Sequence, residues 1–288
     1  MTNKNTIWLA SYPKSGNTWF RIYLSNLLNK SQDPANINDL LDTSISSSRK
    51  LFDDYTGLSS SDLTHDEIDK LRSAVYRMQS QESEELLFKK VHDKFYFTEP
   101  GKPLFPPDIS KGAIYIIRNP FDVLVSFAYH STKPISNMIN SLNDKHFAFC
   151  NNNNKLTNQL RQIMGSWSDH VKSWTEQNII PVHIIRYEDM VLKPYDTFKS
   201  ATDFIGINKT ESEIKKAIIN SDFKILTQQE NKGGFKEKAL KTKSFFRKGI
   251  IGDWKNHLDQ PSIETIISNH NEIMIKFGYL NNKNQPIF

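Results

Sequence analysis

The chain of 288 residues has a single cysteine, Cys150, and no run of about 20 apolar residues. One cysteine excludes an internal disulfide and a cluster of thiolate metal ligands. The lack of a long apolar run argues against a transmembrane helix, and the polar N-terminus does not read as a signal peptide. No helix-turn-helix, zinc-binding or RNA-binding signature is found, and the basic residues are spread along the chain. We therefore expect a cytoplasmic protein that binds neither nucleic acid nor a membrane.

The net charge of +5 is a mild excess that favours anionic ligands. Apolar stretches at 6–11, 86–90, 113–117 and 182–186 read as strands, and helical patterns separate them. This alternation predicts an α/β fold: one domain over residues 1–288, with a mainly parallel central sheet flanked by helices. Apolar residues between 160 and 174 recur at helical spacing, which predicts a helix there.

Residues 12–19 read Tyr-Pro-Lys-Ser-Gly-Asn-Thr-Trp, between the first predicted strand and an amphipathic helical pattern. A strand, a tight loop and a helix in this order direct backbone N–H groups and the positive end of the helix dipole at one point. Gly16 lets the backbone approach a ligand closely, Ser15 and Thr18 add hydroxyl donors, and Lys14 adds a mobile positive charge. The segment is therefore expected to bind an anion as a P-loop-like phosphate site.

The arrangement differs from the phosphate loop of ATP and GTP enzymes, which reads G-x-x-x-x-G-K-[ST]. Here Lys14 precedes Gly16, and the first glycine of that motif is missing. A nucleotide kinase-like phosphotransferase is therefore disfavoured but stays open as an alternative. An ordinary strand-to-helix turn with a solvated lysine is the simplest other reading of this segment.

Two further segments have the chemistry of an anion site. Residues 118–126 read Arg-Asn-Pro-Phe-Asp-Val-Leu-Val-Ser and follow the strand predicted at 113–117. Asn119 is a good helix N-cap and Pro120 a good first helical residue, which puts Arg118 at the carboxyl end of a strand. Residues 245–255 read Phe-Phe-Arg-Lys-Gly-Ile-Ile-Gly-Asp-Trp-Lys. Two adjacent cations before a glycine suit a flexible loop that folds over a multiply charged ligand.

The three segments Y-P-K-S-G-N-T-W, R-N-P-x-D-V-x-V-S and R-K-G-x-x-G-D-W-K resemble those of the cytosolic-type sulfotransferases. They occur in that family's order and spacing over nearly the whole chain. The resemblance implies a sulfotransferase that uses 3′-phosphoadenosine 5′-phosphosulfate (PAPS), releases PAP and requires no metal. It places residues 14–18 on the 5′-phosphosulfate and makes 227–244, which lacks a clear apolar period, a mobile lid. The donor contacts that it implies are Lys14, Ser15, Gly16, Asn17, Thr18, Trp19, Arg118, Ser126, Tyr187, Phe223, Arg247, Lys248 and Gly249.

Residues 86–92 read as a strand that ends in Lys-Val-His and resemble the family's K-[TV]-H segment. Strand alternation puts Lys90 and His92 on one face. Neutral imidazole can take a proton from a hydroxyl group, so His92 is the expected general base. The resemblance also implies that Lys14 and Lys90 stabilise the leaving and transferring groups and that Ser126 steers Lys14. The presence of Lys90 and His92 disfavours a second alternative, a non-catalytic PAP-binding protein.

The acceptor is the least determined part of the prediction. Asp53 and Asp54 lie in a candidate pocket segment and could face a polar or cationic acceptor, or could form a solvated acidic turn. The first reading fits a hydroxylated natural product, such as a guanidinium alkaloid modified by a bacterial tailoring enzyme. Aromatic residues at 95–97, 127 and 129 could instead stack on a phenol. An amine or N-hydroxyl acceptor also stays open. The animal-type C-terminal dimer motif is absent, and Pro261 would spoil extended pairing there.

Overall fold

The computed structural model describes residues 4–29, 31–40, 43–152, 154–239 and 242–288. The chain divides into two compact units, which are described separately below. The first unit comprises Met1–Tyr12, Asp42–Tyr115 and Asp144–Ile184. The second unit comprises Pro13–Leu41, Ile116–Asn143 and Ile185–Phe288.

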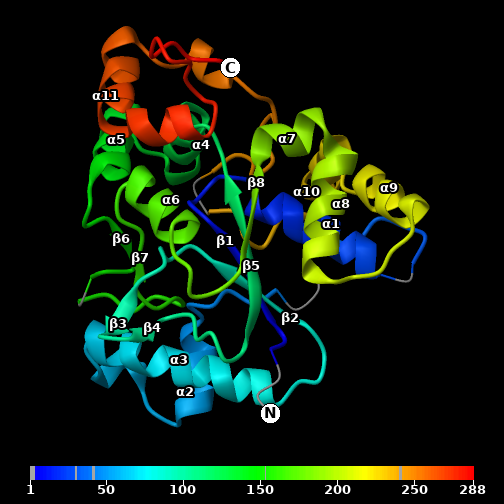
Figure 1. Cartoon of the computed structure of the whole chain (residues 1–288), viewed down its shortest axis with the longest axis vertical. Coiled ribbons are helices and arrows are strands. Elements are labelled where there is room, and N and C mark those ends of the chain that lie inside the picture. Colours follow the sequence, from blue (N-terminus) through cyan, green and yellow to red (C-terminus); the bar gives the residue numbers. More distant parts are fainter. Residues whose placement is uncertain (1–3, 30, 41–42, 153, 240–241) are drawn as a thin grey trace. The chain divides into compact units, whose positions relative to one another are not determined.

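The first unit holds most of a four-stranded sheet of order β2-β1-β5-β8, in which only the last two residues of β5 and of β8 belong to the second unit (Figure 1). Its strands are β1 (Thr6–Ser11), β2 (Leu87–Val91), β5 (Ser110–Ile117) and β8 (Val182–Arg186). β1 pairs in parallel with β2, and every residue of β1 is buried. Such burial explains the continuous apolar run, because parallel strands are covered on both faces. The predicted α/β fold with a parallel central sheet is confirmed; β5 begins three residues earlier than expected, at Ser110.

The rest of the first unit consists of helices and short strand pairs. Its helices are α2 (Arg49–Thr56), η1 (Ser60–Asp62), α3 (His65–Gln81) and α6 (Trp167–Thr175). Its short strands are β3 (Phe97–Glu99), β4 (Lys102–Pro103), β6 (Ala148–Phe149) and β7 (Gln162–Ile163). A capping box at Thr64 and Glu67 begins α3. Because this box satisfies backbone N–H groups at the start of the helix, it sets where α3 begins.

The helix expected between 160 and 174 is only partly correct. The helical part, α6, begins at Trp167, whereas residues 162–163 form a strand. The helix cannot begin earlier, because Gly165 has a left-handed φ of +66° and the Ser166 side chain caps the helix by accepting from the backbone N–H of Asp169. Leu160 and Met164 are nevertheless fully buried, so the apolar spacing reported burial correctly.

The second unit is mainly helical. Its elements are α1 (Asn17–Leu28), α4 (Pro120–Ser131), α5 (Ile135–Asn143), α7 (Tyr187–Leu192), α8 (Pro194–Ile205), α9 (Glu211–Asn220), α10 (Phe223–Gly233), η2 (Asp253–Asn256) and α11 (Gln260–Lys276). α1 packs on α9, and α4 packs on α5 and α11 (Figure 1). Asn119 caps α4 as expected, since its side chain accepts from the N–H of Phe121. Among the described helices, none is long and apolar enough to cross a membrane.

The segment 227–244, which has no clear apolar period in the sequence, is partly helical. Its first part, through Gly233, belongs to α10, which Asp222 caps by accepting from the N–H of Lys224. Leu226 of this helix is buried in an apolar cluster, although the polar residues around it hide the helical period. Residues 240–241 lie outside the described residues. That the segment acts as a lid stays a prediction, as does the single-domain organisation.

Candidate active site

The loop before α1 has a backbone suited to an anion. Lys14 and Gly16 both adopt left-handed conformations, with φ of +70° and +106°, directly before α1 begins at Asn17. Backbone turned in this way directs successive N–H groups into a concavity that binds anions. Between them, Ser15 is fully buried, and its hydroxyl oxygen has no hydrogen-bond partner among the described residues. A buried hydroxyl without a partner beside a helix N-terminus fits a phosphate or sulfate oxygen.

Gly16 also makes room for an aromatic ring. A Cβ atom at this position would lie 2.7 Å from Cδ2 of Tyr187, the first residue of α7. The Tyr187 ring meets the Trp19 ring edge to face at 5.7 Å. Trp19 is itself fixed by a 2.9 Å hydrogen bond from its indole Nε1 to the carbonyl oxygen of Ser221. Two of the aromatic residues that the family resemblance implies as donor contacts, Trp19 and Tyr187, therefore lie together beside the loop.

Arg118 joins three of the predicted donor segments. Its Nη1 donates to the carbonyl oxygen of Lys14 at 3.1 Å, and its Nη2 donates to the carbonyl oxygen of Ile250 at 3.4 Å. Its guanidinium carbon lies 4.1 Å from the ring centre of Tyr187, a cation–π contact. Its Nε is buried without a hydrogen-bond partner in the described part of the chain. The guanidinium therefore retains a donor that an anionic ligand can use.

The predicted cations of the C-terminal motif have a carboxylate partner. Both Arg247 and Lys248 form ion pairs with Asp253, the latter at 2.7 Å. Burial raises the pKa of Asp253, but hydrogen bonds from Lys248 and Arg247 outweigh burial and hold that pKa below its ordinary range. Gly249, with a φ of +68°, accommodates the ring of Phe223, because a Cβ atom would lie 2.6 Å from Cδ2 of that ring.

The remaining predicted donor residues lie in the same unit. Lys14 places its Nζ 4.2 Å from the ring centre of Phe245. Asn17 and Thr18 are buried in the first turn of α1, and Ser126 lies on α4, half-buried. All of the residues expected to bind the donor are thus found in the second unit.

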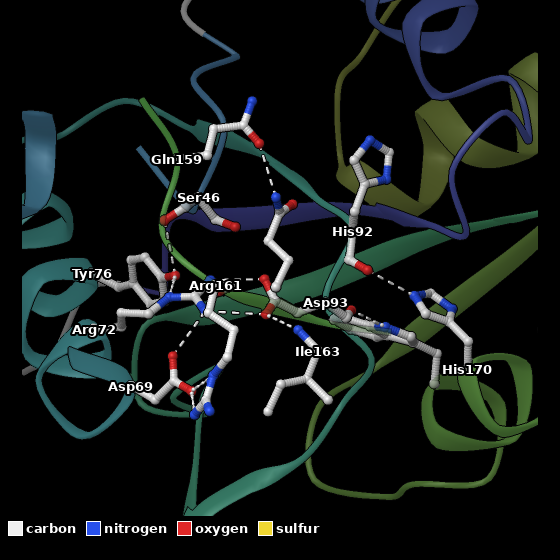
Figure 2. A network of polar contacts seen from close by, with 12 residues as sticks. Ser46, Asp69, Arg72, Tyr76, His92, Asp93, Gln159, Arg161, Ile163 and His170 are labelled. Atoms are coloured by element: carbon white, nitrogen blue, oxygen red, sulfur yellow. Dashed lines mark hydrogen bonds and ion pairs between the residues drawn. The ribbon is translucent and has the colours of Figure 1, made fainter. Parts of the chain in front are cut away.

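The predicted base belongs to the first unit. His92 follows the last residue of β2, and its Nδ1 lies 2.9 Å from the carbonyl oxygen of Ser11, at the end of β1 (Figure 2 shows His92). A carbonyl oxygen can only accept, so the Nδ1 of neutral His92 bears the proton and the lone pair lies on Nε2. Lys90 lies in β2, where its backbone bonds to Ser44 and Ser46. Backbone hydrogen bonds therefore fix Lys90, and the bond to Ser11 fixes the imidazole of His92.

The acidic turn at Asp53 and Asp54 is not observed. Both residues lie in the helix α2. The Asp53 carboxylate accepts from the backbone N–H of Ser60 at 3.0 Å, and Asp54 forms an ion pair with Lys50. Both carboxylates therefore have partners within the protein and do not require an acceptor molecule to balance their charge. Among the described residues, no group of three or more His, Cys, Asp or Glu could hold a metal ion; that the reaction needs no metal stays a prediction.

A family model described as "Sulfotransferase domain" matches residues 4–278. The chain belongs to the sulfotransferase family. This match confirms the resemblance stated above and identifies the chain as a sulfotransferase enzyme. The nucleotide kinase considered as an alternative is a different family.

Several relatives of this sulfotransferase match most of its length. Flavonol 3-sulfotransferase of Flaveria bidentis is 27% identical over 277 residues, which cover 91% of this chain and 79% of the relative. Cytosolic sulfotransferase 5 of Arabidopsis thaliana is 29% identical over 280 residues, which cover 91% and 76%. Among solved structures, mouse sulfotransferase SULT7A1 complexed with PAP aligns with a TM-score of 0.59 at 21% identity, covering 94% of this chain and 85% of that one. This structural likeness confirms the sulfotransferase fold.

Sequence reasoning missed the acidic residues that hold the donor segments of this sulfotransferase in place. Asp122 accepts from the backbone N–H groups of Gly252 and Trp254, at 2.8 and 3.1 Å. Glu188 accepts from the N–H of Asn119 at 3.0 Å, and burial raises its pKa. Asp122 is part of the R-N-P-x-D-V-x-V-S motif, and an acidic residue in the first turn of a helix, here α4, often binds backbone N–H groups. Glu188 likewise lies in the first turn of its helix, α7, but outside the three donor motifs.

Proposed function

We propose that this sulfotransferase moves a sulfuryl group from PAPS to a hydroxyl group of a small molecule, with His92 as general base. The main support for this role of His92 is the 2.9 Å hydrogen bond from its Nδ1 to the carbonyl oxygen of Ser11. It fixes the tautomer in which Nε2 can accept the hydroxyl proton of the acceptor. Ser11 also ends the strand that leads directly into the loop of Lys14. We assign the reaction to the cytoplasm, as for the cytosolic relatives.

The residues of the second unit fit the three parts of the donor. The loop at Lys14–Thr18 suits the 5′-phosphosulfate, because its left-handed backbone and the buried hydroxyl of Ser15 offer donors to anionic oxygens. Trp19, Tyr187 and Phe223 are the aromatic residues for the adenine. Arg118 and Ser126 would bind the 3′-phosphate, joined by the loop at Arg247, Lys248 and Gly249. A guanidinium suits this task because its planar fork binds phosphate through two hydrogen bonds.

When PAPS is bound, it supplies an activated sulfuryl group on a phosphate leaving group. The chain contributes positioning and fixed positive charge, which account for most of the rate enhancement in the analogous transfer of phosphoryl groups. Lys14 donates to the oxygen where negative charge collects, and Lys90 holds the transferring group. Ser126 steers Lys14 until an acceptor arrives. These roles need no metal, because the lysines neutralise the charge.

For the acceptor, the structure favours the aromatic candidates over the acidic ones. The Asp53 carboxylate is bound by the backbone of Ser60, and Asp54 pairs with Lys50. Tyr129 exposes 37% of its surface, and its ring centre lies 5.4 Å from the guanidinium carbon of Arg247. Phe95 is buried against Trp174 and Phe105, and Phe127 is also buried, which removes both from the candidates. We therefore propose a phenol first, with hydroxylated guanidinium compounds and amines as the other classes to screen. The enzyme needs no partner protein in this account.

The test is the turnover of PAPS in the presence of a panel of phenols, hydroxylated guanidinium compounds and amines. We expect wild-type enzyme to sulfate at least one class and His92→Ala to lower turnover by about 100-fold or more. PAP binding should stay nearly intact in that variant. The matched control is His146→Ala, at an exposed histidine of the same unit, which should leave turnover unchanged. Equal loss of PAP binding and of turnover in His92→Ala would contradict the role of His92 as base.

A further inference from the structure

The backbone at His92 and Asp93 is held by two buried side chains of one helix, α6. Nε2 of His170, on α6, lies 3.1 Å from the carbonyl oxygen of His92 (Figure 2). The indole Nε1 of Trp174, one turn later on α6, donates to the carbonyl oxygen of Asp93 at 3.0 Å. The carbonyl groups of two successive residues, the predicted base His92 and Asp93, are therefore both held by hydrogen bonds.

His170 can play this part in only one tautomer. Since a carbonyl oxygen accepts, Nε2 of His170 bears the proton and donates to His92. Nδ1 of His170 then accepts from the hydroxyl of Tyr115, which lies 2.9 Å away on β5. His170 is fully buried, and this burial lowers its pKa to about 3, so it stays neutral at physiological pH. The order Tyr115, His170, His92 is a directed chain of hydrogen bonds between neutral groups.

Asp93 is anchored through its side chain as well. Its carboxylate is fully buried and accepts from both terminal nitrogens of Arg72, at 3.1 and 2.7 Å, and from the backbone N–H of Ile163 at 3.1 Å (Figure 2). Arg72 is itself buried, and its Nε lies 3.0 Å from the hydroxyl of Tyr76. Buried ion pairs contribute little net stability but impose a specific arrangement when every member has a partner. Here that arrangement fixes the residue next to His92.

We propose that His170 and the Asp93–Arg72 pair are positioning residues that hold the imidazole of His92 in its base-competent tautomer. The inference rests on the proposed role of His92. The backbone of His92 is held at its carbonyl by His170, and the imidazole is held at Nδ1 by Ser11. Without the hydrogen bond from His170, the backbone of His92 can shift and its ring can move relative to Ser11. This movement weakens the hydrogen bond that keeps the proton on Nδ1. A displacement of about 1 Å at a reacting group can reduce turnover by about 100-fold.

The decisive measurement is the tautomer of His92 in the PAP complex, read from ring nitrogen NMR shifts of protein labelled at histidine. The His92 signals are assigned by their loss in His92→Asn. We expect wild-type His92 to be protonated on Nδ1 alone, and His170→Phe to show a mixture of the two tautomers. His170→Gln keeps an N–H donor near the original Nε2 position and should restore the wild-type pattern. His270→Phe, at another buried histidine, on α11, is the matched control and should leave the pattern unchanged.

Turnover supplies a second readout with the acceptor that the screen above selects. His170→Phe should lower kcat by about 10- to 100-fold, with the KM for PAPS within about twofold of wild type. The double variant His92→Asn, His170→Phe should lose no more than His92→Asn alone, because the two residues act through one imidazole. Trp174→Phe removes only the donor to Asp93 and gives a milder loss, so the inference stays testable if His170→Phe does not fold.

The outcomes separate the two claims. If His92→Asn turns over as fast as wild type, the proposed function fails, whatever the His170 variants do. If His92→Asn is slow while folded His170→Phe keeps both a single Nδ1 tautomer and wild-type kcat, the positioning role is wrong and the proposed function stands. An additive loss in the double variant also overturns the positioning role.

Discussion

The guanidinium carbon of Arg118 lies 4.1 Å from the centre of the Tyr187 ring. Arg118 comes directly after β5, and Tyr187 is the first residue of α7, so the contact joins segments far apart in the sequence. Arg118 also donates to the carbonyl oxygen of Lys14, and the Tyr187 ring fills the space left by Gly16. The proposed adenine and phosphate contacts are therefore parts of one packed arrangement.

Replacing Arg118 with Lys should weaken PAP binding by about 10- to 100-fold. Lysine keeps the charge but loses the planar fork, which binds phosphate through two hydrogen bonds and stacks on an aromatic ring. Calorimetric titration with PAP measures the loss. Arg77→Lys is the matched control, because Arg77 pairs with Asp108 in the first unit, and it should leave PAP binding unchanged. Wild-type affinity in Arg118→Lys would show that this residue does not bind a phosphate.

Replacing Gly16 with Ala should also weaken PAP binding, by about 10-fold or more, for a steric reason. The new Cβ atom would lie 2.7 Å from the Tyr187 ring, so the loop or the ring must shift. The control is Gly57→Ala, because Gly57 has a left-handed φ of +66° but no atom within 4 Å of a new Cβ. That variant should lose about 1–2 kcal/mol of stability, because an L-residue is strained in the left-handed region, and no PAP affinity. Equal affinities in the two variants would contradict the role given to the packed ring.

Replacing Asp253 with Asn should remove a contribution to stability that depends on pH. The folded-state pKa of Asp253 is lowered, so its ion pairs stabilise the folded protein above the ordinary pKa of about 3.9 and lose this effect as the pH falls further. At pH 7 we expect Asp253→Asn to be less stable in urea by about 1–3 kcal/mol. The gap between the two proteins should narrow below about pH 4. If the difference in unfolding free energy between the two proteins stays constant down to pH 3, the ion pairs do not lower the pKa of Asp253.

The elements that carry a local signal were predictable, and those fixed by distant contacts were not. The strand at Thr6–Ser11 and the cap at Asn119 followed from a buried apolar run and from side-chain chemistry. The helix α10 was missed because only one of its buried residues, Leu226, is apolar, and the segment around it is mostly polar. The loop between β1 and α1 was recognisable from its residues, whereas the pairing of Arg247 with Asp253 was not. Such pairing depends on how a loop folds back on itself, and the spacing of apolar residues in the sequence does not predict loop conformation.

The contacts that hold His92 in place could not be predicted from the sequence either. The Lys-Val-His segment indicated the base, but nothing in the sequence near residue 170 indicated that a second histidine holds its backbone. Likewise, nothing in the sequence indicated that Asp93 is fully buried against Arg72. Partners that lie many residues apart became visible only in the folded chain.

The most direct test of the account is a binding titration with PAP against ADP, in EDTA. The two nucleotides differ in where their second phosphate is attached, and Arg118, Arg247 and Lys248 are proposed to recognise the 3′-phosphate of PAP. We expect tight binding of PAP and weak binding of ADP without any divalent metal. Equal affinity for the two nucleotides, or no binding of either until Mg²⁺ is added, would contradict the proposed donor site.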